Sequence, residues 1–339
     1  MEFGIGMFGD LSYDINTNTY RDVSTKLNEI IQQVQLMDQV GIDVFAIGEH
    51  HRPDYAVSSP EILLAAVATV TKNIKLASGV TVLSSAEPVK VYQDFSTIDL
   101  ISKGRAEIFV GRGSFIESFP LFGYELSDYN QLFEEKLDLL LKINNEENIT
   151  WNGTLRAPMK NQTVYPRAFN NGKLPIWIAV GGTPESVLRA AKLGLPLIVA
   201  IIGGMPKGFR NLIEFYKQEY LRAGHHLDDM QIAVHSHTFV SEDPKVIDDY
   251  FYNYKNQMDR IGASRGWAPF TKMQFDGGRS KDGALFIGSP NEVADKINDI
   301  KEMFGLTRFI AHMDVGDPSH DNMLKSIELF GDKVKPQVS

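Results

Sequence analysis

The chain has 339 residues, a net charge of −9 and no cysteine, with 43% hydrophobic and 23% charged residues. This length suits one barrel with insertions or two smaller domains, and the composition is that of an ordinary globular protein. The acidic balance argues against a nucleic-acid partner, although one basic pocket for a phosphate stays possible, and the lack of cysteine excludes disulfides, thiolate metal sites and cysteine nucleophiles.

The N-terminus, Met1-Glu2-Phe3-Gly4-Ile5, starts directly with strand-like residues. It lacks the charged-then-apolar layout of a signal peptide, and no apolar run approaches the ~18 residues of a membrane span. We therefore expect a cytoplasmic protein that does not associate with a membrane.

Short β-rich runs alternate along the chain with longer amphipathic ones, a pattern typical of βα units around a parallel sheet. Eight such runs fit a closed barrel better than an open doubly wound sheet, which usually has five or six strands. The predicted fold is an α/β fold, a (β/α)8 TIM barrel with insertions. The expected strands are residues 3–8, 44–47, 76–82, 106–110, 176–180, 197–201, 232–239 and 308–312.

Two stretches interrupt this alternation. Residues 151–173 are polar and rich in Asn, and residues 262–283 are rich in Gly and Arg with isolated aromatics. We expect residues 1–339 to form a single domain in which both stretches are long loops or insertions. Loops of this length in a compact domain are usually functional, so the second is a candidate lid.

The predicted second strand ends in Gly48-Glu49-His50-His51. Barrel enzymes place their sites at the carboxyl ends of the strands, so three ionisable side chains here are a candidate active site. The alternative is a polar strand end with solvated histidines. A zinc site is a poor explanation, because adjacent residues on a strand point to opposite faces.

His235 and His237 lie two residues apart on the predicted seventh strand and share a face. They are a better metal pair in isolation, but no carboxylate lies in an obvious partner position. We predict no metal site and favour a buried, hydrogen-bonded role for this pair, whose function the sequence leaves open.

Two further features suggest an anion site. Gly181, Gly182, Thr183 and Ser186 follow an apolar strand and open a helix, where backbone amides, the helix dipole and two hydroxyls attract negative charge. A plain capped helix start is the alternative. Arg112, between two glycines at the end of the fourth strand, neighbours this turn in a sequentially wound barrel, and a guanidinium suits a phosphate.

These features, in this order, resemble the bacterial luciferase-like family of flavin-dependent monooxygenases over nearly the whole chain. The ordered set is far more specific than any of its members. It comprises Glu49-His50-His51, Gly79-Val80-Thr81-Val82-Leu83, Glu87-Pro88-Val89, the run IDLISKGR at 98–105, Gly111-Arg112-Gly113 and Phe122-Gly123.

The resemblance implies specific roles for residues of this chain. His50 matches the family's active-site histidine beside the reactive edge of the flavin, and Arg112 matches a phosphate contact. Gly181, Gly182, Thr183 and Ser186 fall on the turn that holds the FMN phosphate, and a non-proline cis peptide is expected between Gly79 and Val80. The family places it under the flavin ring, and such a bond persists only at functional sites.

The sequence also departs from luciferase itself. Gly111 stands where luciferase has a reactive cysteine, so light emission is not implied. The phosphate turn carries glycine where luciferase has an acidic residue, which keeps FMN plausible but blurs the individual contacts.

The implied activity uses reduced FMN from a separate flavin reductase, together with O2, to oxygenate a small organic substrate through a flavin peroxide. His50 would assist proton transfer with its pKa near neutrality, whereas Glu49 and His51 would orient it. The resemblance further implies a homodimer. The alternatives are a deazaflavin-dependent oxidoreductase on the same scaffold and a non-catalytic flavin-binding protein. The substrate cannot be read from the sequence.

Overall fold

The structure, a computed structural model, describes residues 1–113 and 115–338. Parallel strands close into a barrel in the order β1-β4-β5-β7-β10-β11-β12-β14, with β14 paired back to β1. The predicted (β/α)8 barrel is therefore confirmed, and all eight expected strands are present. They are β1 (Glu2–Met7), β4 (Val44–Ile47), β5 (Lys75–Ser78), β7 (Ala106–Gly111), β10 (Ile176–Val180), β11 (Leu197–Ala200), β12 (Ile232–Val240) and β14 (Arg308–His312).

The run predicted as one strand over residues 76–82 is divided in two. Strand β5 ends at Ser78, the cis peptide Gly79-Val80 follows as expected, and β6 (Thr81–Val82) then pairs with β7. A short additional strand, β13 (Phe286–Gly288), extends the pairing of β12. The pairing with β7 is thus interrupted at Gly79 and Val80, after the carboxyl end of β5, and resumes at Thr81.

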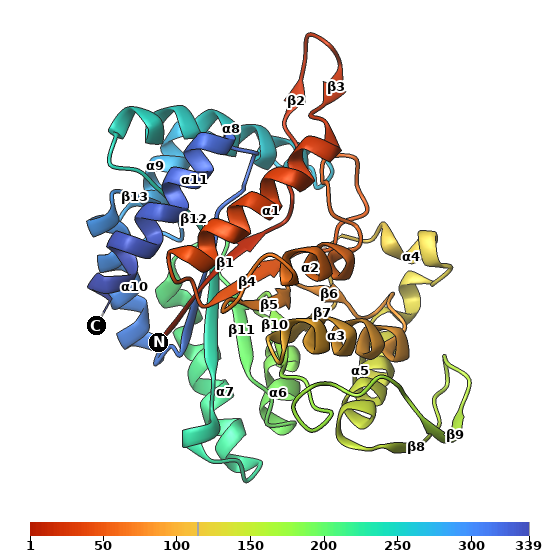
Figure 1. The fold of residues 1–339 in the computed structure, drawn as a ribbon. Coiled ribbons are helices and arrows are strands. Elements are labelled where there is room, and N and C mark those ends of the chain that lie inside the picture. Colours follow the sequence, from red (N-terminus) through yellow and green to blue (C-terminus); the bar gives the residue numbers. More distant parts are fainter. Residues whose placement is uncertain (114, 339) are drawn as a thin grey trace.

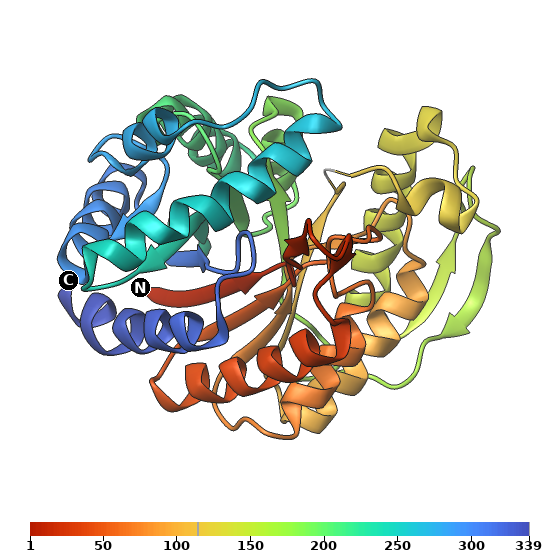
Figure 2. The same ribbon diagram turned by 90° about the horizontal axis from the view of Figure 1, so that it is seen from above.

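Helices surround the strands, as the view from above shows (Figure 2). Proline occupies the first position of α2, α6 and α10, and Ser289 forms a capping box with Glu292 at α10. No helix in the described part of the chain is both long and apolar enough to cross a membrane. The helices are α1 (Val23–Gln39), α2 (Pro60–Ala68), α3 (Pro88–Ser102), α4 (Ser118–Phe122), α5 (Tyr129–Asn145), α6 (Pro184–Lys192), α7 (Arg210–Arg222), α8 (Pro244–Ala263), α9 (Lys272–Arg279), α10 (Pro290–Phe304) and α11 (His320–Leu329).

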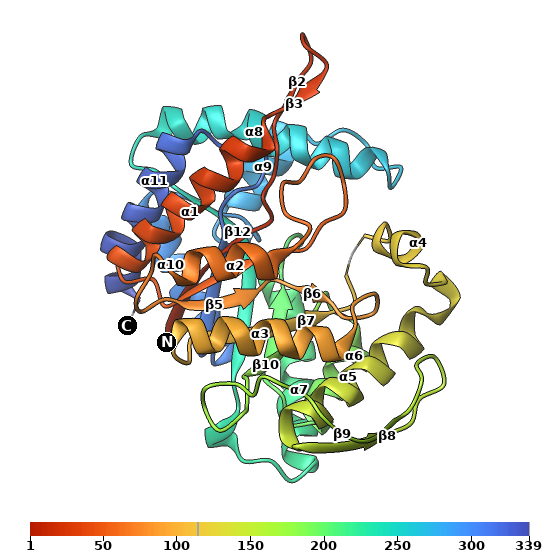
Figure 3. The ribbon, with the colours of Figure 1, turned by 45° about the vertical axis from the view of Figure 1, so that its right-hand side comes forward.

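The two interruptions contain regular structure. Strands β8 (Asn148–Trp151) and β9 (Met159–Thr163) form an antiparallel hairpin, so the first stretch is an ordered insertion. Helix α9 lies inside the second stretch, where Thr271 and Gln274 form a capping box. A further hairpin, β2 (Tyr13–Asp14) with β3 (Thr19–Tyr20), projects beyond the barrel (Figures 1 and 3).

A layer of buried apolar side chains fills the barrel between its two ends. At its amino-terminal end Arg308 is buried, pairs with Glu107 at 2.6 Å and lies 4.2 Å from the centroid of the Trp177 ring. This end is occupied by structural ion pairs, which leaves the carboxyl ends of the strands as the site for chemistry. The apolar layer consists of Val44, Ala46, Ala77, Phe109, Trp177, Ile198, Ala233 and Ile310.

Candidate active site

Four histidines gather at the carboxyl ends of the barrel strands, a region that we call the mouth. Side chains alternate along a strand, so residues two apart from the apolar interior positions of β4, β12 and β14 also face inward. Burial lowers the pKa of each imidazole. The pKa falls to about 3 for His50 and His237, to about 4 for His235, and well below its usual range for His312. All four are neutral at pH 7. The mouth histidines are His50, His235, His237 and His312.

His50 lies in an aromatic enclosure. Its ring stacks on Tyr55 at a centroid distance of 4.2 Å and contacts Phe8 at 4.5 Å and Phe115 at 5.3 Å. Neither ring nitrogen has a hydrogen-bond partner within the described residues. Buried polar atoms are nearly always paired, so a donor and an acceptor left free here indicate a ligand site. The expectation that His50 titrates near neutrality is wrong, because burial holds it neutral.

Glu49 and His51 occupy supporting positions. One carboxylate oxygen of Glu49 accepts the backbone N–H of Val82 at 2.8 Å, and the other lies 2.9 Å from Nε2 of His51. Glu49 therefore ties the end of β4 to the segment that follows the cis peptide. This arrangement fits the orienting role expected for both residues.

An enclosed cavity of about 70 Å³ lies beside His50. It is smaller than the 300–1,000 Å³ typical of ligand pockets, so a ring-sized ligand requires neighbouring side chains to turn aside. Its lining combines the strand end after β4, the cis-peptide segment and the residues that follow β7. It consists of Phe8, Glu49, His50, His51, Gly79, Val80, Val82, Gly113, Phe115, Glu117 and Ser118.

The predicted convergence of Arg112 with the turn before α6 is confirmed. The Arg112 guanidinium lies 3.4 Å from the Thr183 hydroxyl and donates to Asn130 Oδ1 at 2.6 Å, while Thr183 donates to Ser186 at 2.9 Å. This follows from the topology, because β7 pairs with β10. A guanidinium and two hydroxyls within reach of one another form a favourable anion site.

The glycines before α6 leave this anion site open. Gly182 has φ of +122°, a conformation that side chains disfavour, and a Cβ added at Gly181 would meet no atom within 4 Å. Arg112 itself does not contact His50 among the described residues. It is, however, followed in the chain by Gly113, which lines the His50 cavity, so the backbone segment that carries Arg112 also borders the cavity.

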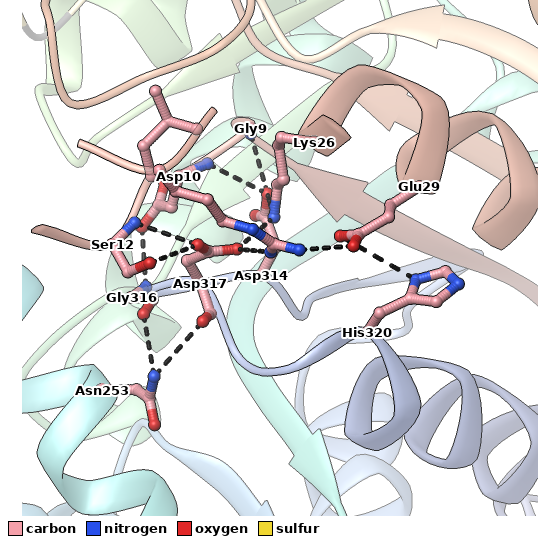
Figure 4. A network of polar contacts seen from close by, with 12 residues as sticks. Gly9, Asp10, Ser12, Lys26, Glu29, Asn253, Asp314, Gly316, Asp317 and His320 are labelled. Atoms are coloured by element: carbon pink, nitrogen blue, oxygen red, sulfur yellow. Dashed lines mark hydrogen bonds and ion pairs between the residues drawn. The ribbon is translucent and has the colours of Figure 1, made fainter. Parts of the chain in front are cut away.

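A buried ionic network supports the mouth from the side of β1 and β14 (Figure 4). Lys26 of α1 lies 3.0 Å from Asp317 and 3.8 Å from Asp314, and Asp10 accepts the N–H of Gly316 at 2.8 Å. Burial, followed by the charge of Asp314, raises the pKa of Asp10 well above its usual range. The sequence analysis missed this network, although Asp10 and Asp314 lie just beyond the ends of their strands.

His235 and His237 do not form a pair. Nε2 of His235 lies 3.0 Å from Nδ1 of His312, whereas Nδ1 of His237 lies 2.8 Å from the hydroxyl of Tyr254 on α8. Within residues 1–113 and 115–338 no cluster of three His, Asp or Glu side chains is arranged to hold a metal ion. Each histidine is instead engaged in a different hydrogen-bonded contact.

The fold is a (β/α)8 barrel whose candidate site lies at the carboxyl ends of its strands. Residues 1–307 match the luciferase-like monooxygenase family, and the chain belongs to that family. It is similar to the alkanal monooxygenase alpha chain of Photorhabdus luminescens, with 23% identity over 94% of this chain and 95% of the relative.

Two solved structures share the fold across almost the whole of both chains. One is the oxygenating constituent of 3,6-diketocamphane monooxygenase of Pseudomonas putida in complex with FMN, with a TM-score of 0.76, 22% identity and coverage of 100% of this chain and 99% of that one. The other is the coenzyme F420-dependent tetrahydromethanopterin reductase of Methanopyrus kandleri, with a TM-score of 0.74, 17% identity and the same coverage. At these identities the likeness shows the fold alone.

Proposed function

We propose that this protein binds FMN at the mouth of the barrel and uses reduced FMN and O2 to transfer one oxygen atom to a small organic substrate. The observation that carries the proposal is the adjacency of two features: the anion site at Arg112 and the buried His50 with both ring nitrogens free. Together they provide one place for a phosphate and one for proton exchange.

The residues present fit FMN. Arg112, Thr183 and Ser186 would hold its phosphate, and the exposed backbone at Gly181 and Gly182 permits close approach. Val80, which lines the cavity, would support the ring system, with Glu49 fixing the segment behind it. When bound, reduced FMN supplies the electrons that activate O2.

His50 is suited to proton exchange as a neutral imidazole. It offers one N–H donor and one lone pair at an enclosed surface, and the aromatic side chains of Phe8, Tyr55 and Phe115 exclude water from it. Exclusion of water matters because it prevents loss of activated oxygen as hydrogen peroxide.

A second cavity provides the proposed place for the organic substrate. It measures about 390 Å³ and lies between the segment after β11, Tyr254 of α8 and α9. Its walls are mainly glycine and apolar side chains, including Ile202 and Leu285. We therefore expect a small, mostly apolar substrate.

The alternative cofactor is a deazaflavin, which would make the protein a hydride-transferring oxidoreductase. Its long acidic tail calls for several cations at the rim. Among the contacts of the described residues, Arg112 is the cation that faces the Thr183 hydroxyl, and the neighbouring Arg189 is paired with Glu134. This favours the shorter, singly phosphorylated FMN. The free nitrogens of the buried His50 favour an enzyme over a non-catalytic flavin carrier.

Titration with oxidised and reduced FMN, followed by stopped-flow mixing with O2, tests this function. We expect binding of FMN and oxygen consumption by the reduced complex, and His50→Ala should bind FMN while losing substrate-dependent product. Absence of oxygen uptake, combined with hydride transfer from reduced deazaflavin, would contradict the proposal. Unchanged product formation by His50→Ala would contradict the role of that residue.

We also propose a homodimer that receives reduced FMN from a separate reductase in the cytoplasm. Exposed apolar side chains on α2 and α3 support pairing through these helices: Ile62 is 73% exposed and Ile101 is 47% exposed. Sedimentation of Ile62→Lys beside the wild-type protein tests it. A wild-type monomer would contradict the dimer.

A further inference from the structure

Two mouth histidines lie in line with a buried carboxylate. Nε2 of His235 is 3.0 Å from Nδ1 of His312, and Nε2 of His312 is 3.4 Å from Oδ1 of Asp314. The first separation is a hydrogen bond. The second is longer than a normal hydrogen bond, so in this geometry Asp314 acts on the His312 ring through its charge, and a proton transfer between the two groups requires them to move closer.

The surroundings of Asp314 fix the direction of this line. Its carboxylate accepts the backbone N–H groups of Phe8, Gly9 and Asp10 at 3.0, 2.8 and 3.3 Å. Burial raises the pKa of Asp314, and Lys26 with these three N–H groups lowers it. A carboxylate held by donors can only accept, so it favours the His312 tautomer with hydrogen on Nε2.

The tautomer of His312 sets that of His235. With its hydrogen on Nε2, His312 presents a lone pair on Nδ1, and His235 must then donate from Nε2. Nδ1 of His235 is left with a lone pair and makes no hydrogen bond to any described residue, and this side chain is partly exposed whereas His312 and Asp314 are buried.

The line lies next to the candidate active site. The centroid of the Phe8 ring lies 4.5 Å from that of His50, 6.1 Å from that of His235 and 4.1 Å from that of His312. Gly6 makes room for His235, because a Cβ there would lie 2.8 Å from its Nε2. The three imidazoles therefore lie around one aromatic ring at the mouth.

We propose that His235, His312 and Asp314 form a proton relay that serves the mouth, with Nδ1 of His235 as the exchanging atom. The identity of the group it serves rests on the proposed function. A proton accepted at Nδ1 of His235 is matched by transfer of its Nε2 proton to Nδ1 of His312, and of the His312 Nε2 proton to Asp314. Both imidazoles end neutral with exchanged tautomers, and one negative charge at Asp314 is neutralised.

A relay of this kind suits a desolvated interior better than a single base. Burial lowers the pKa of His235 to about 4, so an imidazolium does not persist there at neutral pH. Transfer along the line moves the proton to the Asp314 carboxylate. Burial raises the pKa of this carboxylate, whereas it lowers the pKa of the imidazoles. Other titratable groups that act on the line are His50 after β4, His237 of β12, Lys26 of α1, Asp10 after β1 and Tyr250 of α8. Asp317 is connected to it through Lys26.

The first experiment needs neither cofactor nor variant. Nitrogen-15 NMR of histidine-labelled apoprotein reports the tautomer and charge of each ring. We expect His235 and His312 to be neutral with hydrogen on Nε2 from about pH 5 to about pH 9. Hydrogen on Nδ1 of His312, or a charged His312, would overturn the relay.

The second experiment follows oxidation of the reduced FMN complex by O2 in mixtures of H2O and D2O. We expect at least a tenfold slower reaction in His312→Phe and His235→Gln, and a change from a curved to a linear proton inventory. His225→Gln is the control, because His225 lies outside the mouth, with Nε2 3.1 Å from the carbonyl oxygen of Lys192, and it should keep the wild-type inventory. A wild-type rate and inventory in His312→Phe would overturn the relay, whereas failure to bind FMN would overturn the proposed function and leave the NMR result to decide the relay.

Discussion

Replacement of Arg112 by alanine should weaken FMN binding without unfolding the protein. The guanidinium is half-buried and reaches Asn130 and Thr183 across the anion site. A charge-assisted hydrogen bond in such a setting contributes about 1.5–3 kcal/mol, which corresponds to a loss of affinity of roughly 10- to 150-fold. The FMN affinity of Arg112→Lys should lie between those of the wild type and Arg112→Ala, because an ammonium group keeps the charge but not the planar arrangement of donors.

Riboflavin is the matched ligand for this test, because it has the same ring system and no phosphate. Quenching of flavin fluorescence gives both dissociation constants for wild type and variant. We expect the loss to appear with FMN and not with riboflavin. Equal losses for the two flavins, or no loss for FMN, would refute the assignment of Arg112 to the phosphate.

Three further predictions concern stability and the shape of the site. Lys26→Met removes the buried cation that Asp314 and Asp317 share and should lower the free energy of unfolding in urea by about 3 kcal/mol at pH 7. The deficit should be smaller in acid, where those carboxylates protonate, and a deficit that grows in acid would contradict this. Gly111→Ala places a Cβ 2.8 Å from Cγ2 of Val80, so FMN affinity should fall more than thermal stability does, as parallel titration and melting curves would show. The four mouth histidines are neutral when folded and titrate near 6.5 when unfolded, so stability is present above that pH and is lost as pH falls toward 3–4. Unfolding at about pH 5.5 should therefore take up about four protons through these groups. The pH dependence of urea unfolding curves measures this uptake. A free energy of unfolding that does not change between about pH 7 and about pH 5 would contradict the neutral state of these histidines.

The strands were predictable because a short, continuously apolar run is typical of a parallel strand whose two faces are both buried. The convergence of Arg112 with Thr183 followed from strand adjacency alone. The division of residues 76–82 could not be located from periodicity, since Thr81 and Val82 are as strand-like as Leu76. Helix α9 was hidden by its glycines, although Thr271 and Gln274 have the spacing of a capping box.

The enclosure of His50 was beyond prediction for a different reason. Tyr55 and Phe115 come from irregular segments after β4 and β7, and no periodicity places a loop side chain. The pKa of His50 follows from that enclosure, so it was mispredicted with it. His312 and Asp314 were findable, because both lie at the end of a strand where barrel sites are built.

The apolar layer across the barrel closes its interior toward the amino-terminal ends of the strands. Phe109, Trp177 and Ile310 separate the ion pairs around Arg308 from the mouth histidines. Any ligand, and any proton exchanged with solvent, therefore reaches His50 and His235 from the same side. A single closure over the mouth would interrupt the supply of both at once, so access and reactivity cannot be adjusted independently in this fold.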